Sequence, residues 1–172
     1  MKNKFAFTAL FFLLCCGLFT GTVYAQSKTF VFPYAFSAQD LYGKPVTEKS
    51  LGEKELFFVH YFATWCPPCV KEIPDLAAIA KRYGSRVGFI GLLDDYQGNK
   101  AAAIRLAEKA GVTFIIVDAE HSDFEKLLQL VQSGYVPTTV LIGRDGKLVG
   151  EQIIGAYGSK YANYIDKALG GQ

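Results

Sequence analysis

The sequence predicts one α/β domain with a central mixed β-sheet flanked by helices. Nearly continuous apolar runs at residues 56–62 and 87–93 are typical of strands buried on both faces. Helical apolar patterns follow these runs at residues 70–83 and 100–110. A tight hairpin turn at residues 144–147 joins later apolar segments. We therefore expect a sheet that is parallel at first and antiparallel towards its C-terminal end.

The remaining elements follow the same periodicities. Phe30, Phe32, Tyr34 and Phe36 alternate with other residues, which indicates an extended strand, and residues 40–46 have the turn chemistry of a hairpin tip. Further along the chain we expect a strand at 113–117, a helix at 123–132, strands at 136–142 and 148–154, and a last helix capped by Ser159 and ending at Leu169. Pro74 lies inside the helical pattern, so a kink is expected there.

The first 25 residues differ from the rest of the chain. Lys2 and Lys4 precede an apolar run at residues 5–19, and small residues suited to cleavage precede Gln26. This pattern predicts a secretory signal peptide at 1–25 and a single domain at 26–172. Two alternatives stay open: an uncleaved segment that tethers the protein to a membrane, and lipidation at Cys15 or Cys16.

Removing residues 1–25 changes the charge and the cysteine content. The chain has 18 basic and 16 acidic residues, and the segment holds two of the lysines and no acids, so 16 of each remain. A near-neutral domain without a basic cluster does not indicate nucleic acid or an anionic membrane as a partner. Of four cysteines, Cys66 and Cys69 remain, in a compartment where disulfides persist.

Cys66 and Cys69 form the motif with the clearest chemistry. Two intervening residues let them close a small disulfide ring, and they stand where a strand pattern meets a helix pattern. A helix N-terminus favours a thiolate and commonly lowers a cysteine pKa from ~8.5 to about 3.5–7.5. A ring this small constrains the unfolded chain only weakly, so redox chemistry is a better explanation than stapling.

Four segments carry a resemblance to the thioredoxin superfamily. They lie at residues 40–46, 62–69, 71–76 and 136–139, and the match covers roughly residues 36–169. Together they resemble the exported TlpA/ResA-like thiol-disulfide oxidoreductases. The resemblance implies a thioredoxin-like fold with an N-terminal hairpin extension and a strand-helix unit inserted at residues 111–133.

The same resemblance implies residue roles. Cys66 would be the exposed nucleophile and Cys69 would resolve the mixed disulfide. Pro137 would be a cis-proline, and the backbone of Val136 would pair with a substrate strand. The expected substrate-contacting residues are Trp65, Pro67, Pro68, Val136, Pro137 and Thr138.

Glu72 and His60 are the candidate proton carriers. Glu72 follows Cys69 by one helical turn and matches a family glutamate near the dithiol; the alternative is a solvated side chain. His60 departs from the family, which carries an acid or asparagine at this position. We expect either a satisfied core histidine or, as a hypothesis, a neutral base that accepts the Cys69 proton.

The sequence also predicts the surroundings of Trp65 and His121. Trp65, the only tryptophan, is expected at the rim of the disulfide, where it would shield the bond. His121 stands among scattered acids and is expected in a solvated loop without metal-site spacing.

The expected function is reduction of disulfides in exported proteins, located in the periplasm or cell envelope. Pro67 and Pro68 offer no N–H groups to a Cys66 thiolate, which favours a low potential. The resemblance suggests apocytochrome c as a substrate and a membrane thiol reductant as electron donor. We expect a monomer with no cofactor beyond the Cys66–Cys69 disulfide. The alternatives are a Cu(I)-delivery protein using both cysteines with His60 or His121, and a peroxidase.

Overall fold

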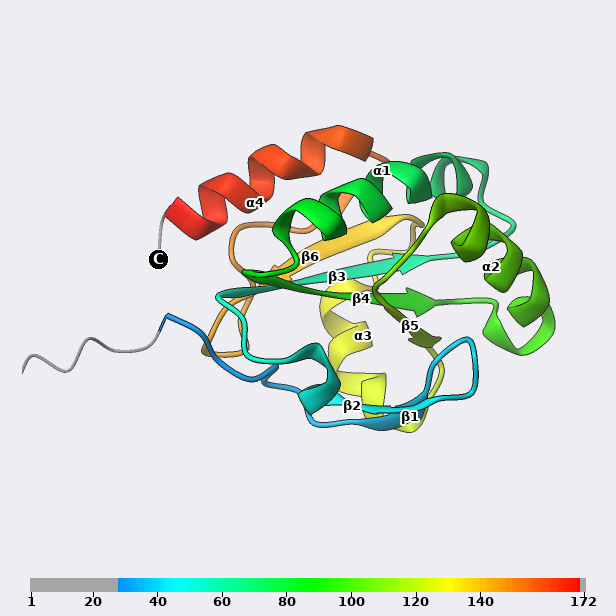
Figure 1. Cartoon of the computed structure of the whole chain (residues 1–172), viewed down its shortest axis with the longest axis horizontal. Helices are drawn as coiled ribbons and strands as arrows, with labels where there is room; N and C mark the ends of the chain where they lie inside the picture. The colour runs from blue at the N-terminus through cyan, green and yellow to red at the C-terminus, as the bar shows by residue number, and fades with distance from the viewer. Residues whose placement is uncertain (1–27, 171–172) are drawn as a thin grey trace, which may run out of the picture.

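A five-stranded mixed sheet forms the centre of the computed structural model, with strand order β5-β4-β3-β6-β7 (Figure 1). In the middle, β3 (Leu56–Phe62) pairs in parallel with β4 (Val87–Leu93) and antiparallel with β6 (Thr138–Ile142). At the two edges lie β5 (Ile115–Asp118), parallel to β4, and β7 (Ile153–Ile154), antiparallel to β6. The predicted change from parallel to antiparallel pairing is confirmed.

The structure describes residues 28–170. The signal peptide predicted at 1–25, with Cys15 and Cys16, lies outside the described residues. Within residues 28–170 no helix combines the length and the apolar character that crossing a bilayer requires.

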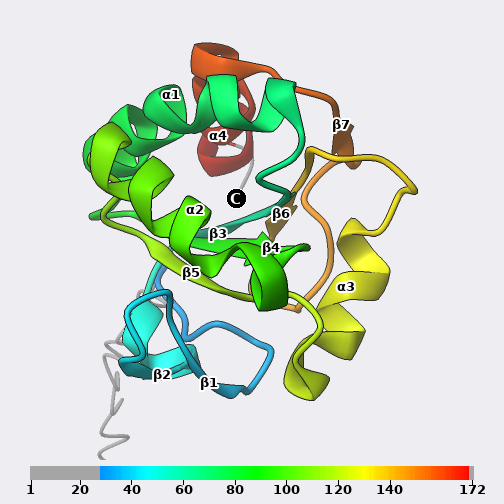
Figure 2. The same cartoon turned by 90° about the vertical axis from the view of Figure 1, so that its right-hand side faces the viewer.

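Helices cover both faces of the sheet. One set of helices lies on one face, and a further helix with a separate hairpin lies on the other (Figures 1 and 2). The first set is α1 (Pro67–Tyr83), α2 (Tyr96–Ala110) and α4 (Tyr161–Gly170), and the second is α3 (Glu125–Val131) with β1 (Ser37–Gln39) and β2 (Pro45–Thr47). The two faces have separate apolar cores.

Successive side chains of β3 point to opposite faces of the sheet, so they pack against different sets of helices. Phe58 and Phe62 pack in the core under α1, whereas Phe57 and Val59 pack in the core under the hairpin and α3. Burying one such side chain contributes about 1.5–3 kcal/mol, so a slip of one residue in register is strongly disfavoured. His60 has the parity of Phe58, and this places it beneath α1.

The hairpin extension and the inserted unit are both present. β1 and β2 pair antiparallel, and the hairpin contacts the insert through a bridge between Asp40 and Val117 in β5. The inserted unit consists of β5 and α3, joined by a 3₁₀ turn at Ser122–Phe124. The predicted thioredoxin-like fold is therefore confirmed.

The aromatic segment before the hairpin is not a strand, contrary to expectation. Phe30, Phe32 and Phe36 are buried, but the only strand-like pairing among the described residues of this segment is a bridge from Phe30 to Lys54. The segment is held by ring packing instead, as between Phe32 and Phe57, whose centroids lie 4.9 Å apart. The alternation of aromatic residues in this segment therefore indicates burial and not pairing in a sheet.

Several boundaries differ from the expected ones. The last strand shrinks to β7, because Gly150 takes a φ of 86° and interrupts the segment after a bridge between Ile142 and Leu148. Ser159 does not cap α4, since it lies within a 3₁₀ turn at Gly158–Lys160. α1 continues through Pro74 as one helix, and the kink stays a prediction. The remaining shifts are small: α2 begins at Tyr96, β5 at Ile115 and α3 at Glu125.

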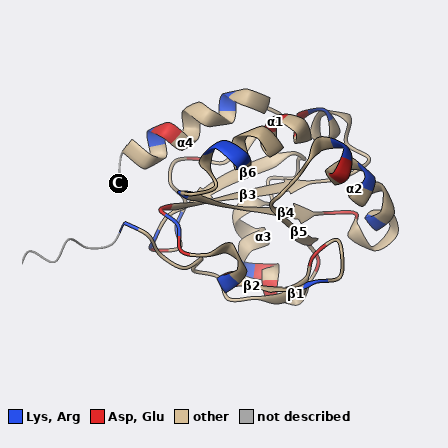
Figure 3. Ribbon diagram, viewed as in Figure 1, with Lys and Arg blue, Asp and Glu red and all other residues tan. Residues whose placement is uncertain are grey.

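Charged residues belong mainly to helices and loops, as the coloured ribbon in Figure 3 shows. The central strands β3, β4 and β6 contain no Lys, Arg, Asp or Glu. Against this apolar background, the buried polar residues stand out: His60, Glu72, Thr138 and Thr139.

Candidate active site

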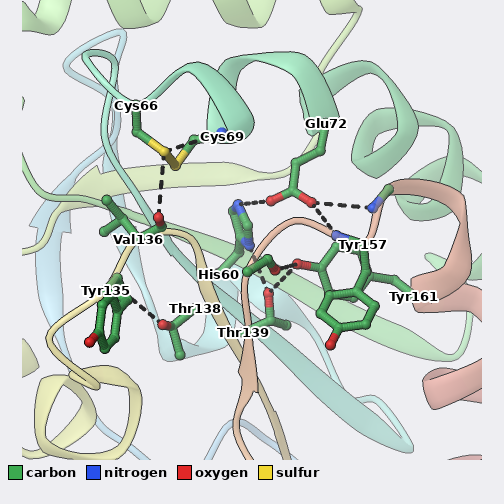
Figure 4. Close-up of polar contacts among 12 residues, drawn as sticks. His60, Cys66, Cys69, Glu72, Tyr135, Val136, Thr138, Thr139, Tyr157 and Tyr161 are labelled. Carbon is green, nitrogen blue, oxygen red and sulfur yellow. Dashed lines mark hydrogen bonds and ion pairs between the residues drawn. A yellow bond between two sulfur atoms is a disulfide. The ribbon is translucent and has the colours of Figure 1, made fainter.

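The two motif cysteines form a disulfide at the N-terminus of α1 (Figure 4). Cys66 is the N-cap of the helix and its Sγ accepts a hydrogen bond from the Cys69 backbone N–H at 3.2 Å. Pro67 and Pro68 occupy the first two helical positions, where a missing N–H costs nothing, and both are exposed. The sulfur of Cys66 therefore lies where the helix dipole stabilises negative charge.

Cys66 is less accessible than expected for a nucleophile. Its residue is 3% exposed and Cys69 is 0% exposed. The reason is the loop before β6, because the Val136 carbonyl oxygen lies 3.6 Å from Cys66 Sγ. Approach to the sulfur must therefore occur over this loop.

The Val136–Pro137 peptide bond is cis, as the resemblance implied. It places the Val136 carbonyl beside the disulfide, as Figure 4 shows. The residues expected to contact substrate thus converge from two regions of the sequence, the start of α1 and the loop before β6.

Thr138 has a different position from the one expected. Its side chain is buried, and its hydroxyl bonds the Tyr135 carbonyl at 2.8 Å and the Ser133 hydroxyl at 2.7 Å. These bonds fasten the loop that carries Val136. The Thr138 hydroxyl therefore stabilises the substrate-facing loop and is itself turned away from the surface.

An open groove of about 580 Å³ adjoins this loop. Trp65 and Tyr135 line it and are 63% and 69% exposed, so two large aromatic surfaces face solvent beside Val136. Trp65 therefore lies at the rim, as expected, and is exposed, whereas the two cysteines of the disulfide are buried. Tyr61, Asp94, Gln132 and Gly134 complete the lining.

Glu72 is buried, so the solvated alternative is excluded. It is 3% exposed, and its Oε2 accepts hydrogen bonds from the backbone N–H groups of Tyr157 and Gly158 at 3.0 and 3.3 Å. Burial raises the pKa of this carboxyl to about 7, and the two N–H donors offset part of that rise. A carboxyl with such a pKa exchanges protons readily near neutral pH.

His60 is also buried, with both ring nitrogens facing polar groups. Nδ1 lies 2.8 Å from Thr139 Oγ1, and Nε2 lies 3.5 Å from Glu72 Oε1 (Figure 4). Burial holds the pKa of His60 well below its ordinary value, so the ring is neutral. The nitrogens of His60 thus face Thr139 and Glu72, and neither faces Cys69. The hypothesis that His60 accepts the Cys69 proton directly is therefore not supported.

Thr139 and Tyr161 belong to this cluster but were missed from the sequence. Thr139 is paired with His60 across β3 and β6, and its hydroxyl lies 3.1 Å from the Tyr161 hydroxyl. The strand register, once known, predicts the first contact. No sequence pattern connects Tyr161 in α4 with a histidine 101 positions earlier.

The described residues do not form the copper site considered above. Within residues 28–170 no three His, Cys, Asp or Glu side chains gather in a way that could hold a metal ion. His60 is engaged by Thr139 and Glu72, and His121 accepts a hydrogen bond from the Asp123 backbone N–H. The Cu(I)-delivery alternative is therefore not favoured.

Comparisons with known proteins agree with this geometry. A model of the AhpC/TSA family matches residues 32–150. The chain is 30% identical to the thiol-disulfide oxidoreductase ResA of Bacillus cereus, over 90% of both chains. It is 23% identical to the sporulation thiol-disulfide oxidoreductase A of Bacillus subtilis, over 76% of this chain and 77% of that protein.

A solved structure extends the agreement to the fold. A thiol:disulfide interchange protein of Chlorobium tepidum superposes with a TM-score of 0.67 at 27% identity, covering 84% of this chain and 99% of that one. The similarity therefore covers most of this chain and nearly all of that one. The chain belongs to the AhpC/TSA family, among its thioredoxin-like thiol-disulfide oxidoreductases.

Proposed function

We propose that the protein reduces disulfides in exported proteins outside the cytosol. The observation that carries the proposal is the contact between Cys66 and the cis-proline loop: Cys66 Sγ lies at a helix N-terminus and 3.6 Å from the Val136 carbonyl. The Cys66 thiolate attacks a substrate disulfide, and Cys69 then attacks Cys66 Sγ and releases the reduced substrate. A membrane thiol reductant restores the dithiol.

The environment of Cys66 supports the reducing direction. Its sulfur receives one backbone N–H bond, from Cys69, and both prolines of the loop lack a donor. Strong oxidants owe their potential to a well-stabilised thiolate, so a sparsely bonded sulfur favours a potential nearer the thioredoxin value of about −270 mV than the DsbA value of about −120 mV. Oxidised apocytochrome c is the proposed substrate, and the groove beside Val136 is its proposed docking site.

The redox potential of the Cys66–Cys69 couple tests the direction. We expect a value below about −220 mV, measured by equilibration with glutathione or dithiothreitol buffers. A potential above about −150 mV would overturn the assignment as a reductase. Reduction of an oxidised peptide carrying two cysteines separated by two residues, followed by mass spectrometry, tests the substrate class separately.

A further inference from the structure

Two buried polar atoms face each other between β3 and α1. His60 Nε2 and Glu72 Oε1 lie 3.5 Å apart, and within the described part of the chain neither has a hydrogen-bond partner. The two residues are 1% and 3% exposed, so bulk solvent does not reach these atoms. An unsatisfied buried polar group costs about 1–3 kcal/mol. A proton between the two atoms forms a hydrogen bond that gives each of them a partner.

The neighbouring hydrogen bonds give the direction of this proton. The Gly155 carbonyl can only accept, so the Tyr161 hydroxyl, 3.2 Å away, donates its single hydrogen there. The Tyr161 oxygen then accepts the hydrogen of the Thr139 hydroxyl at 3.1 Å. Thr139 Oγ1 has no further hydrogen to give, so it accepts from His60 Nδ1 at 2.8 Å. The network assigns the Nδ1–H tautomer to His60.

The other oxygen of Glu72 completes the assignment. Oε2 already accepts two backbone N–H bonds, from Tyr157 and Gly158, so a proton on the carboxyl sits on Oε1. There it points at the free lone pair of His60 Nε2. Two further titratable groups act on Glu72, the Tyr161 hydroxyl and the Asp75 carboxylate. Burial keeps Tyr161 neutral by raising its pKa. A hydrogen bond from Tyr161 lowers the Glu72 pKa, and Asp75 raises it. If Tyr161 donates its hydrogen to Glu72 instead of to Gly155, the Tyr161 oxygen still accepts the hydrogen of the Thr139 hydroxyl. The Nδ1–H tautomer of His60 is therefore unchanged.

We propose that Thr139 and Tyr161 are positioning residues that hold His60 in the Nδ1–H tautomer, so that His60 Nε2 accepts a hydrogen bond from the protonated Glu72 carboxyl and Glu72 keeps this proton available for Cys69. The inference rests on the proposed function of the Cys66–Cys69 pair. Glu72 lies one helical turn after Cys69 in α1. When Glu72 is ionised, its Oε1 faces the lone pair of His60 Nε2, and the two repel. Glu72 is therefore a stronger base than a solvated glutamate.

The proton balance follows the redox cycle. When a thiolate of a dithiol donor attacks Cys66 Sγ, a donor–Cys66 disulfide forms, the Cys66–Cys69 bond breaks and the Cys69 thiolate takes the proton from Glu72 Oε1. The second thiol of the donor then displaces Cys66 as a thiolate, which leaves the oxidised donor and the Cys66–Cys69 dithiol. When the dithiol reduces a substrate, Cys66 first forms a mixed disulfide. Cys69 then gives its proton back to Glu72 as its sulfur attacks Cys66 Sγ, and the substrate thiolate leaves. Each turn thus moves one proton between Cys69 and Glu72.

Heteronuclear NMR of the histidine rings in the oxidised protein tests the tautomer directly. The chain has two histidines, so a His121→Gln variant assigns the spectrum without altering the cluster. We expect His60 to carry its proton on Nδ1 near neutral pH. A proton on Nε2 in the unaltered protein would overturn the proposal, whatever the behaviour of any variant.

Two substitutions test the positioning role. Thr139→Val removes the acceptor of Nδ1–H, and Tyr161→Phe frees the Thr139 hydroxyl to donate to Nδ1. Both changes favour the Nε2–H tautomer, which donates to the Glu72 carboxylate and stabilises its charge. We expect the carboxyl titration of Glu72, followed by NMR, to move down by about one pH unit or more in Thr139→Val. The shift should be downward but smaller in Tyr161→Phe, because the lost Tyr161 hydroxyl itself lowers the Glu72 pKa.

The matched controls are Thr113→Val and Tyr42→Phe, which change a residue of the same type at an exposed position outside the cluster. Their Glu72 titrations should equal that of the unaltered protein. An unshifted titration in folded Thr139→Val and Tyr161→Phe would contradict the positioning role. If a variant does not fold, the His60 tautomer measured in the unaltered protein still tests the proposal.

Kinetics separate this inference from the proposed function. An aromatic disulfide that releases a coloured thiolate reports two steps, attack by Cys66 and resolution by Cys69. If the unaltered protein shows neither step, the proposed function fails while the tautomer remains measurable. If both steps occur, the pH midpoint of the second should fall in Thr139→Val and Tyr161→Phe together with the Glu72 titration. A midpoint that stays constant would contradict Glu72 as the carrier.

Discussion

The Sγ atom of Cys66 lies 3.6 Å from the carbonyl oxygen of Val136, although the two residues are 70 positions apart. The disulfide sulfur has no hydrogen, so in the oxidised protein this is a packing contact. After reduction, a Cys66 thiol can donate to the same oxygen. The contact makes the cis-proline loop part of the reactive surface, and a substrate must pass over it to reach the sulfur.

Replacing each cysteine separately should distinguish their roles. In Cys69→Ser, Cys66 can still attack a substrate disulfide but cannot be resolved, so a mixed disulfide should accumulate. In Cys66→Ser, the remaining thiol is fully buried and little adduct should form. Mass spectrometry after incubation with an oxidised peptide measures both. Equal trapping by the two variants would contradict the assigned order.

Stability should fall as pH rises, because Glu72 is buried. Its pKa in the folded protein is raised from 4.5 to about 7, so the folded state resists ionisation. The stability from this carboxyl is fully present below pH ~4.5 and is lost as pH rises through ~7, by about 3 kcal/mol. Urea titrations of the oxidised protein between these pH values measure the slope.

The control for this slope is a comparison of two substitutions. Glu72→Gln cannot ionise, so its stability should vary less over the same pH range than that of the unaltered protein. Glu108→Gln alters an exposed glutamate on α2 and should keep the original slope. Parallel curves for the unaltered protein and Glu72→Gln would remove Glu72 as the cause.

The emission of Trp65 should differ between the oxidised and reduced proteins. Trp65 is the only tryptophan, it directly precedes Cys66, and it lines the groove beside Val136. Reduction changes the polar and quenching groups near its ring. Fluorescence spectra recorded before and after dithiothreitol treatment test this placement, and superimposable spectra would argue against it.

Thr138 should matter through the loop that it fastens. Thr138→Val removes hydroxyl bonds to Tyr135 and Ser133, so we expect a loss of about 1–3 kcal/mol in the free energy of unfolding. A looser loop should also raise KM for an oxidised peptide more than it lowers kcat. Thr113→Val, at an exposed position, is the control. An unchanged unfolding midpoint would show that these bonds contribute little.

Much of the fold was predictable because its signals are local. Residues 56–62 and 87–93 are apolar apart from His60 and form β3 and β4 with those bounds. The aromatic alternation from Phe30 to Phe36 was misleading, since alternating burial arises both from strand pairing and from ring packing. The end of the sheet was shortened by Gly150, whose positive φ no periodicity reveals.

The sequence by itself determined the fold class and the reactive pair, since spacing and helix position place Cys66 and Cys69 without reference to the rest of the chain. Only the tertiary structure decided what surrounds them. The Val136 carbonyl beside Cys66, the burial of Glu72 and the links from His60 through Thr139 to Tyr161 join β3, α1, β6 and α4. Such contacts depend on strand register and helix packing, which act across long sequence separations and leave no local pattern.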